Sequence, residues 1–273
     1  MAQAIFAVTH SYTPVFNTPD LARCFGGGDG ASLLLSSQGL MHEVETVLFP
    51  GTKLQLIEQV AHSSVWRITT EEYPYEEAQF IDERFVARCP EEPASRMITL
   101  PPAATILQTM RDALGARYMW GSTCLEGIDS LPTFYPSKVA LQFLPSLIQD
   151  TWKLKGVDCS GLLRRATQGW TPHRTSSLVD LGKPVAIEGL SAEEIAGQLQ
   201  PLDLIVWVGH VVIAEDSNTT IESTPQEGVI RLNACERIQE IMGKKRKRPV
   251  NSWASTTGER FVVRRWYPES VMV

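Results

Sequence analysis

Cys159 stands in a sequence setting that favours a reactive thiolate. It lies in the segment GVDCSGLLRRATQGW, residues 156–170, where the apolar residues after Asp158 recur at helical spacing and Gly169 can end the helix. Asp158 is then a candidate N-cap, and Cys159 falls in the first helical turn. Unpaired backbone N–H groups and the helix dipole stabilise a thiolate there, lowering the thiol pKa from about 8.5 towards roughly 3.5–7.5 when a cation also helps. We therefore expect Cys159 to be a nucleophile.

His210 is the histidine best placed to serve as the base. It begins GHVVIAE directly after PLDLIVWVG, and these two apolar stretches predict strands joined by a tight turn at Gly209. An imidazole on a strand that faces a helix N-terminus can pair with the thiolate and later protonate a leaving amine. A single cysteine or histidine is more often structural, but the two contexts together favour catalysis. The remaining cysteines lack such a context and are expected to be structural: Cys24, Cys89, Cys124 and Cys235.

Four segments resemble, in the same order, the signature blocks of the NlpC-type cell-wall cysteine peptidases, a papain-like superfamily. They are RYMWGS at 117–122, DCSGL at 158–162, PHRTSS at 172–177 and GHVVI at 209–213. The resemblance spans Tyr118 to Glu222. It implies an α+β, papain-like catalytic domain with helices packed on an antiparallel sheet. It also implies a cysteine peptidase or amidase acting on peptidoglycan peptides, with Cys159 as nucleophile, His210 as base, and neither a cofactor nor a metal.

The third catalytic position of the family corresponds to Glu222, twelve residues after His210. Family members usually carry His, Asn or Gln there, but a carboxylate can also hold an imidazolium and fix its tautomer. Because strand side chains alternate between faces, Glu222 reaches His210 only if the hairpin loop through 216–218 has an odd number of residues. With a two-residue loop, Ser223 would take the place of Glu222.

The resemblance also implies a substrate site. In family members that cut between D-glutamate and a diamino acid, the residues matching Asp158 and Tyr118 help to bind the free amine of the stem peptide. Ser160, Arg174 and Ser176 are further candidates for this pocket, and the expected partners are stem peptides or muropeptides with a free N-terminal amine. A carboxylate beside a phenol prefers a cationic partner, which agrees with that role.

The chain departs from the family in one place. Tyr118 and Cys159 are 41 residues apart, whereas about twenty separate them in typical members. The extra stretch, Cys124 to Trp152, contains the helix-like VALQFLPSLIQDTW interrupted by Pro145. It could form a lid, alter the substrate or make a dimer contact, and it leaves the bond that is cut and the oligomeric state open.

The first hundred residues predict a separate all-β domain. Short alternating strands are expected at 44–49, 53–60, 65–69 and 79–86. The pattern resembles a bacterial Src-homology-3-like barrel. A proline-rich change of composition between Cys89 and Ala104 marks the boundary. We therefore predict an SH3-like barrel over 1–98 and the papain-like catalytic domain over 99–273.

Composition limits the function classes. With 273 residues, 43% hydrophobic, the chain can bury a sizeable core, and a formal charge of −6 gives no general attraction to nucleic acid or anionic lipid. The basic run Lys244 to Arg248 is interpreted as a solvated loop. Five scattered cysteines without C-x-x-C spacing suggest a reducing compartment. No secretory signal or membrane span is recognised, so a cytoplasmic location is expected, with export by a non-standard route as the alternative.

Two other function classes fit the same residues. The glutamate at the third position and the long insertion would suit a catalytically silent protein that binds or scaffolds cell-wall peptides. A papain-like acyltransferase would keep the thiolate and use it on another acyl group. Reactivity of Cys159 separates the first class from an enzyme, and the chemistry of the pocket around Asp158 separates the second.

Overall fold

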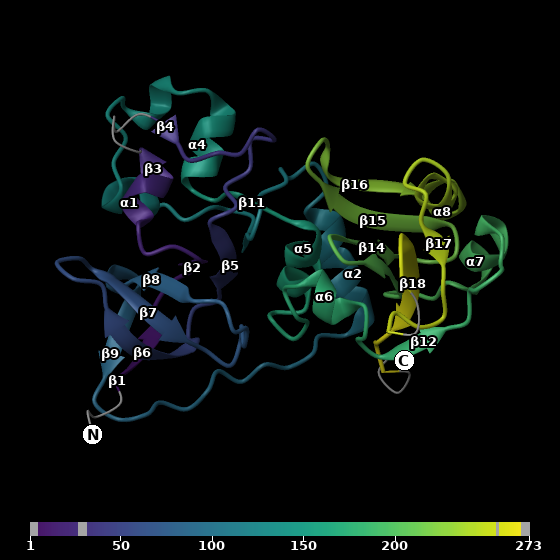
Figure 1. Cartoon of the computed structure of the whole chain (residues 1–273), viewed down its shortest axis with the longest axis horizontal. Coiled ribbons are helices and arrows are strands. Elements are labelled where there is room, and N and C mark those ends of the chain that lie inside the picture. Colours follow the sequence, from purple (N-terminus) through teal and green to yellow (C-terminus); the bar gives the residue numbers. More distant parts are fainter. Residues whose placement is uncertain (1–4, 27–31, 255–256, 269–273) are drawn as a thin grey trace. The chain divides into compact units, whose positions relative to one another are not determined.

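The computed structural model describes residues 5–26, 32–254 and 257–268 and divides the chain into two compact units (Figure 1). The first unit comprises Met1–Ile98 with Met119–Asp158, and the second comprises Thr99–Tyr118 with Cys159–Val273. Each unit is built on one large antiparallel sheet with several helices, and the first unit also contains two short two-stranded sheets. The predicted mixture of α and β structure with antiparallel sheets is therefore confirmed. The SH3-like and papain-like identities of the two parts stay predictions.

The first unit is built on a seven-stranded antiparallel sheet with the strand order β5-β2-β8-β7-β6-β1-β9. The strands of the N-terminal segment are β1 (Ile5–Thr9), β2 (Thr13–Phe16), β3 (Phe25–Gly26), β4 (Ser32–Leu33), β5 (Val44–Leu48), β6 (Lys53–Gln59), β7 (Val65–Thr69), β8 (Gln79–Asp82) and β9 (Val86–Cys89). Strands β3 and β4 pair with each other as a separate two-stranded sheet. The helices of that segment are α1 (Leu21–Cys24) and the 3-10 turn η1 (Glu83–Phe85). The four predicted strands correspond to β5, β6, β7 and β8, which confirms them within a few residues.

Alternation along the strands of this sheet places one row of side chains inside. In β6, Leu54 and Leu56 are buried and join a core cluster with Ile68 and Ile81, whereas Lys53 and Gln55 point the other way. Because every second residue along such a strand is buried, the sequence alternates between apolar and polar residues, and this alternation is what the strand predictions relied on.

Residues 119–158 pack with the first unit, although the predicted domain division placed them with the catalytic part. They form β10 (Thr123–Cys124), α3 (Leu131–Phe134), η2 (Leu141–Phe143), α4 (Ser146–Trp152) and β11 (Gly156–Val157). Pro145 precedes α4, so the interruption expected at this proline is found. Trp152 is fully buried in a cluster with Phe16, Phe25 and Leu131, and its indole Nε1 donates to the carbonyl oxygen of Tyr135 at 2.8 Å.

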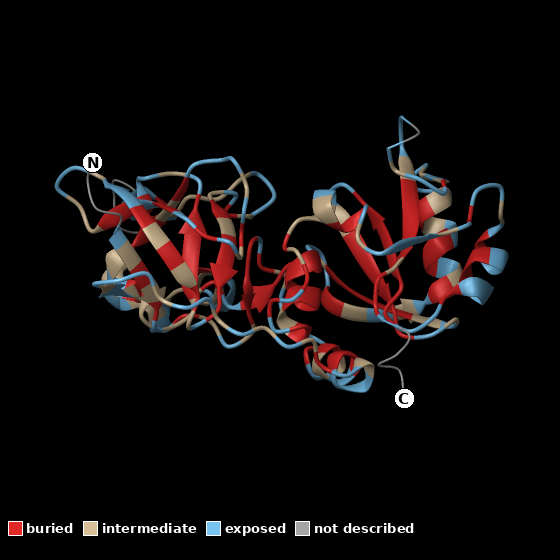
Figure 2. Ribbon diagram, turned by 90° about the horizontal axis from the view of Figure 1, so that it is seen from below, coloured by how far each residue is buried: buried red, intermediate tan, exposed pale blue. Residues whose placement is uncertain are grey.

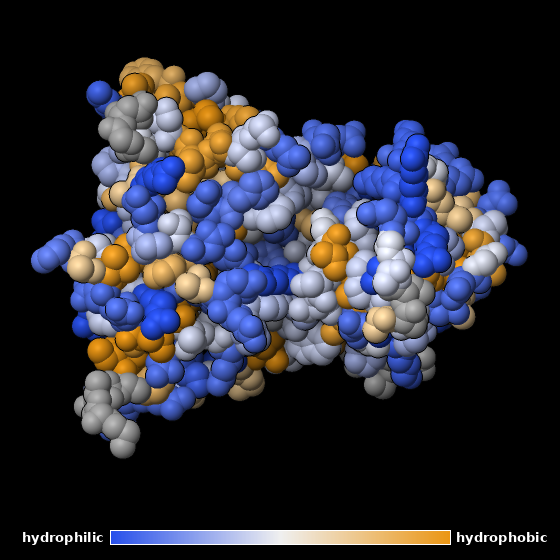
Figure 3. Space-filling model, viewed as in Figure 1, coloured by the Kyte–Doolittle hydropathy of each residue, from blue (hydrophilic) through white to orange (hydrophobic). Residues whose placement is uncertain are grey.

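The same insertion also carries apolar surface. Val139, Phe143 and Leu147 are exposed, and hydrophobic surface gathers over α4 in the space-filling view (Figure 3). Its helices therefore bury one apolar face against the first unit and leave other apolar side chains in contact with solvent.

The second unit is built on the sheet β12-β18-β13-β14-β15-β16, in which all neighbouring strands are antiparallel. A short strand, β17, pairs in parallel with β18. The strands are β12 (Lys183–Val185), β13 (Leu204–Trp207), β14 (His210–Ala214), β15 (Thr219–Thr224), β16 (Gly228–Asn233), β17 (Arg248–Pro249) and β18 (Arg260–Arg265). The helices are α2 (Ala103–Asp112), α5 (Cys159–Ala166), α6 (Thr175–Leu178), α7 (Ala192–Gln198) and α8 (Ala234–Met242).

Helices lie on both sides of these strands, with α2, α5 and α6 on one side and α7 and α8 on the other (Figure 1). Helix α5 packs against α2 and against strands β14 and β15. Ile205, Val212 and Ile238 belong to the core cluster shared with α7 and α8. Covering both faces explains why β13 and β14 are nearly unbroken apolar runs that are almost wholly buried. The inner strands of this unit are coloured mostly as buried in Figure 2.

Replacing Trp152 with alanine is expected to lower the free energy of unfolding by about 3–5 kcal/mol, because the change leaves a large cavity in a packed core. Urea unfolding followed by circular dichroism measures it. Phe143→Ala is the matched control in the same insertion: Phe143 is 75% exposed, so its loss should change stability by no more than about 0.5 kcal/mol. Equal effects for the two variants would contradict the packing of the insertion on the first unit.

Candidate active site

Cys159 is the first residue of α5 and is 5% exposed. The sequence-based expectation of a short amphipathic helix is confirmed, since Leu162, Leu163 and Ala166 are buried. Gly169 is the residue expected to end the helix, but the left-handed position that follows the helix falls one residue earlier, at Gln168, with φ of 54°. The N–H of Gly169 donates to the carbonyl of Arg164 at 2.8 Å, as in a Schellman motif.

Asp158 is held by the segment that contains the RYMWGS block. Its carboxylate oxygen Oδ2 accepts a hydrogen bond from the backbone N–H of Gly121 at 2.9 Å. Gly121 has φ of 67°, and a Cβ there would lie 2.6 Å from the carbonyl oxygen of Val44. The glycine of this block is therefore needed for backbone conformation and close packing, and its N–H fixes the orientation of the Asp158 carboxylate.

His210 and Glu222 are in direct contact on neighbouring strands. The Nε2 of His210 lies 2.6 Å from Oε2 of Glu222. The histidine side chain is 12% exposed and the glutamate side chain has no exposed surface. Because a carboxylate only accepts hydrogen bonds, Nε2 carries the proton in this contact and Nδ1 is left for other chemistry.

The register of β14 and β15 explains how Glu222 reaches the histidine. Ile213 pairs with Ile221 and Ala214 with Thr220, so the turn between the strands is centred on residue 217 and has an odd number of residues. Glu222 therefore points to the same face as His210 and lies diagonally across from it. This is the loop geometry that the predicted pairing required, and Ser223 faces the other side of the sheet.

Arg237 on α8 is a further partner of Glu222 that sequence reasoning missed. Its Nη2 donates to Oε2 at 2.8 Å, and its Nε lies 2.6 Å from Oε1, off the line of a hydrogen bond. Arg237 is 4% exposed, and its Nη1 also donates to Glu240 at 2.6 Å. Arg237 occupies one ordinary position of an amphipathic helix, so no spacing or motif marks it in the sequence.

The charge state of Glu222 follows from these partners. Burial by itself raises the pKa of the carboxyl group, but the hydrogen bond and charge of His210 and the charge of Arg237 outweigh it. The net result is a Glu222 pKa below its ordinary value. Burial lowers the pKa of Arg237, but the charges and hydrogen bonds of Glu222 and Glu240 together outweigh it, so this pKa is raised. Glu222 is therefore a negatively charged carboxylate at neutral pH.

Aromatic and basic side chains adjoin the histidine. The ring of Trp207 lies 5.2 Å from that of His210. The Nζ atoms of Lys245 and Lys247 lie 5.5 and 5.3 Å from the centre of the Trp207 ring. Burial, followed by the charge of Arg237, lowers the pKa of Lys245. The predicted solvated loop is confirmed for most of the basic run, whose residues are exposed apart from the half-buried Lys247. Two of its lysines nevertheless lie near the tryptophan beside His210.

The other predicted site residues occupy several places. Tyr118 is half-buried and follows Ala116, whose carbonyl accepts from the N–H of Val229 on β16. Ser160 is buried, and its Oγ donates to the carbonyl of His173 at 3.5 Å. Arg174 immediately precedes α6, and Ser176 is an exposed residue within that helix.

The PHRTSS block is tied to the turn that precedes His210. The backbone N–H of Gly209 donates to Oγ1 of Thr175 at 2.8 Å. Helix α6 also packs against β13 and β14, the two strands of that turn. The blocks at 172–177 and 209–213 are therefore in contact within the second unit. Helix α5, which contains most of the block at 158–162, packs against β14, the strand that begins at His210.

Comparison with known proteins finds structural neighbours at low similarity. No family model matches the chain, and no curated protein matches it. Among solved structures, an NlpC/P60 family protein from Bacillus cereus is 17% identical, with a TM-score of 0.36 over 97% of this chain and 64% of its own. NlpC2 from Trichomonas vaginalis is 12% identical, with a TM-score of 0.35 over 98% of this chain and 74% of its own. NlpC1 from the same organism is 14% identical, with a TM-score of 0.36 over 98% and 95%.

Replacing Glu222 with glutamine should lower the free energy of unfolding at pH 7 by about 3–5 kcal/mol, because it leaves Arg237 buried without its anion. The Glu222 pKa lies below its unfolded value of 4.5. Its ionised form therefore contributes stability above that pH, and this contribution is lost as pH falls through the folded pKa. Urea unfolding across a pH series should show the gap between wild type and variant narrowing below about pH 4.5.

Glu240→Gln is the control for this measurement. Glu240 contacts the same arginine, but its side chain is 35% exposed. Its loss should cost less than about 1 kcal/mol. A gap for Glu222→Gln that stays constant or widens on acidification would contradict the assignment of a depressed pKa.

Proposed function

We propose that the protein is a cysteine peptidase or amidase that hydrolyses peptidoglycan stem peptides at the γ-D-glutamyl–diamino acid bond. Cys159 is the nucleophile, His210 the base and Glu222 the residue that orients it. The observation that carries this proposal is the 2.6 Å contact between His210 and a fully buried Glu222, on the two strands against which the helix of Cys159 packs. The motif blocks around these residues supply the substrate class.

The chemistry follows from the atoms available. The Cys159 sulfur, as a thiolate, attacks the γ-glutamyl carbonyl carbon, and the backbone N–H of Cys159 can stabilise the resulting oxyanion. Nδ1 of the His210 imidazolium then protonates the departing amine, which breaks the C–N bond and leaves an acyl-enzyme. A water molecule, deprotonated by the same nitrogen, attacks the thioester and releases the acid and the thiol.

Glu222 and Arg237 act through the histidine in this scheme. Glu222 accepts a hydrogen bond from the Nε2–H of His210, so it fixes the tautomer that presents Nδ1 to the reaction and stabilises the imidazolium. Burial raises the pKa of Glu222, but His210 and Arg237 together lower it by more, so the carboxylate stays ionised and does not take that proton itself. Glu222 is thus a positioning residue, and Arg237 supports its charge.

The substrate preference rests on Asp158, Tyr118 and their neighbours. Gly121 holds the Asp158 carboxylate through a hydrogen bond at 2.9 Å. A fixed anion beside the nucleophile favours a peptide whose free amino group can approach it. We therefore propose short stem peptides with an unblocked amino terminus as substrates, as would arise in the cytoplasm during wall turnover. Among the described residues, every helix is too short or too polar to cross a membrane.

Cys159→Ala should abolish the release of diaminopimelate from L-Ala-γ-D-Glu-diaminopimelate, because the reaction has no other nucleophile. Mass spectrometry of the digest measures it, and circular dichroism checks that the fold is intact. The wild-type enzyme should cleave the same peptide more slowly when its amino terminus is acetylated. Full turnover by the Cys159→Ala variant would end the proposal.

Alkylation with iodoacetamide separates the enzyme from a silent binding protein. An activated thiolate reacts near pH 6, whereas an ordinary thiol with a pKa near 8.5 reacts little there. Peptide mapping should show Cys159 modified first among the five cysteines. An acyltransferase would also be alkylated at Cys159, but in the digest it would transfer the acyl group to an added acceptor in preference to water.

Substitutions at Glu222 test its role in orienting the base. Glu222→Gln keeps a hydrogen-bond acceptor but loses the charge, so kcat should fall by roughly 10- to 100-fold. Glu222→Ala removes both and should reduce kcat by up to about 10⁴-fold, with KM little changed in either case.

The matched control for these variants is Glu215→Gln. Glu215 is also buried and is paired with two arginines, Arg111 and Arg231, in the same unit. A purely structural effect of losing a buried carboxylate would lower activity in the Glu215 variant as well. Wild-type kcat in Glu222→Ala would contradict the proposed role of Glu222.

A further inference from the structure

The basic run Lys244 to Arg248 lies beside the proposed base, and the proposed chemistry does not use it. The Nζ atoms of Lys245 and Lys247 lie 5.5 and 5.3 Å from the centre of the Trp207 ring. That ring in turn lies 5.2 Å from the ring of His210. Both ammonium groups are therefore within the span of about three extended residues of the imidazole, and all four side chains belong to the second unit.

The backbone of the run is fixed to the helix that precedes it. The N–H of Lys245 donates to the carbonyl of Glu240 at 3.1 Å, and the N–H of Lys247 donates to the carbonyl of Ile241 at 3.0 Å. Both acceptors lie in the last turn of α8, the helix that also carries Arg237. The two lysines therefore start from a defined backbone position, and their ammonium groups lie against an aromatic ring.

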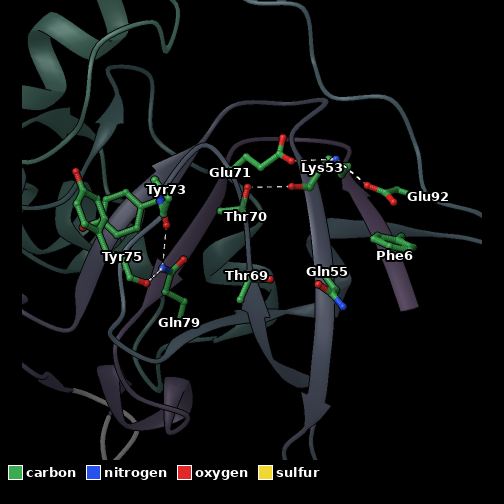
Figure 4. Close-up of a pocket in the computed structure, with 11 residues that line it drawn as sticks. Phe6, Lys53, Gln55, Thr69, Thr70, Glu71, Tyr73, Tyr75, Gln79 and Glu92 are labelled. Carbon is green, nitrogen blue, oxygen red and sulfur yellow. Dashed lines mark hydrogen bonds and ion pairs between the residues drawn. The ribbon is translucent and has the colours of Figure 1, made fainter. Parts of the chain in front are cut away.

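Lys245 differs from other lysines of the chain in its ionic partners. In the first unit, Lys53 stands between two carboxylates at 3.4 and 2.9 Å (Figure 4). Lys247 is paired with Glu259. Among the residues that the structure describes, Lys245 makes no ion pair. Its ammonium group is therefore held near His210 without a contacting anion.

The carboxylates that act on Lys245 are already bound by an arginine. Glu222 and Glu240 attract the ammonium group electrostatically, but Arg237 forms ion pairs with both. Burial, followed by the charge of Arg237, lowers the pKa of Lys245. Cations therefore predominate around this ammonium group, and an added anion would stabilise it.

We infer that Lys245, with Lys247 beside it, binds a carboxylate of the residue that leaves when the peptide is cut. The inference rests on the proposed function, in which His210 protonates the departing amine. Groups that adjoin this histidine therefore adjoin the leaving residue, whereas Asp158 receives the free amine at the other end of the substrate. A peptide with a cationic amino terminus and an anionic leaving residue would be bound at both ends.

A leaving diaminopimelate residue offers two carboxylates. One is attached to the carbon that bears the departing nitrogen, and the other stands at the end of the side chain. A leaving lysine residue has only the first, and lysinamide has neither. The three peptides in which L-Ala-γ-D-Glu is followed by each of these residues therefore test the inference one carboxylate at a time.

Lys245→Gln should raise KM about three- to fivefold for the diaminopimelate peptide and leave kcat nearly unchanged, because it removes a binding contact and no reacting group. The lysinamide peptide should show no such rise, because it lacks both carboxylates. Loss of the effect with the lysine peptide identifies the side-chain carboxylate as the ligand, and its retention identifies the main-chain carboxylate. An equal rise in KM for all three peptides would overturn the inference.

Two variants are matched to Lys245→Gln. Lys244→Gln removes the same charge from the same run, but Lys244 is exposed and the cations over the Trp207 ring are Lys245 and Lys247. Its KM should therefore change less than about 1.5-fold. Lys245→Arg keeps the cation and should retain a KM close to that of the wild type. Equal effects of Lys244→Gln and Lys245→Gln would indicate a general attraction of charge and refute the site.

Binding to a variant that cannot hydrolyse the peptides separates this inference from the proposed function. In the full Cys159→Ala chain, the diaminopimelate peptide should shift the indole N–H resonance of Trp207 and bind more tightly than the lysinamide peptide. Adding Lys245→Gln should remove the difference in affinity. If the wild type cleaves no peptide yet this pattern holds, only the peptidase proposal fails. If the peptides are cleaved but all bind the Cys159→Ala variant equally, only the inference fails.

Discussion

Glu222 carries a negative charge where water does not reach it, and such a charge is tolerated in a folded protein only when it is paired. His210 meets one of its oxygens and Arg237 meets both. The elements of the second unit that supply these groups lie close together in the chain, between residues 210 and 242. Strand β14 brings the imidazole, β15 the carboxylate, and α8, which follows β16 directly, the guanidinium. The orientation of the histidine thus depends on the register of one hairpin and the position of one helix.

Glu215 is a second buried carboxylate in the same unit, and its partners are arginines only, with no histidine among them. Glu215 is paired with Arg111 from α2 and Arg231 from β16, so it fastens the end of β14 to a helix and to a more distant strand. Its partners are permanent cations on both sides. Glu222 differs in having one permanent cation and one imidazole, whose two ring nitrogens can each donate or accept a proton. That difference distinguishes a structural ion pair from one suited to proton transfer.

The parts of the structure that depend on short-range pattern could be predicted from the sequence. The helix beginning at Cys159, the strand beginning at His210 and strands β5 to β8 follow from local periodicity and turn residues. The meeting of Glu222 with His210 could be stated in advance as a condition on loop length. Arg237 could not be found, because its role arises from the packing of α8 against the sheet, which is set by contacts remote in sequence. The packing of residues 119–158 with the first unit could not be predicted from the sequence either, because the spacing of their apolar residues does not specify which surface they pack against.

The division of the chain between its two units bears on the order in which they can form during synthesis. The core cluster of the first unit runs from Phe16 to Leu154, yet residues 99–118, which include α2, belong to the second unit. On a ribosome, the first unit therefore cannot complete its interior until Leu154 has emerged, and α2 must wait for partners that are translated later still. A truncation at residue 98 would separate the early strands from Trp152 and its neighbours. Neither unit is a continuous stretch of the chain, so no single cut separates one complete unit from the other.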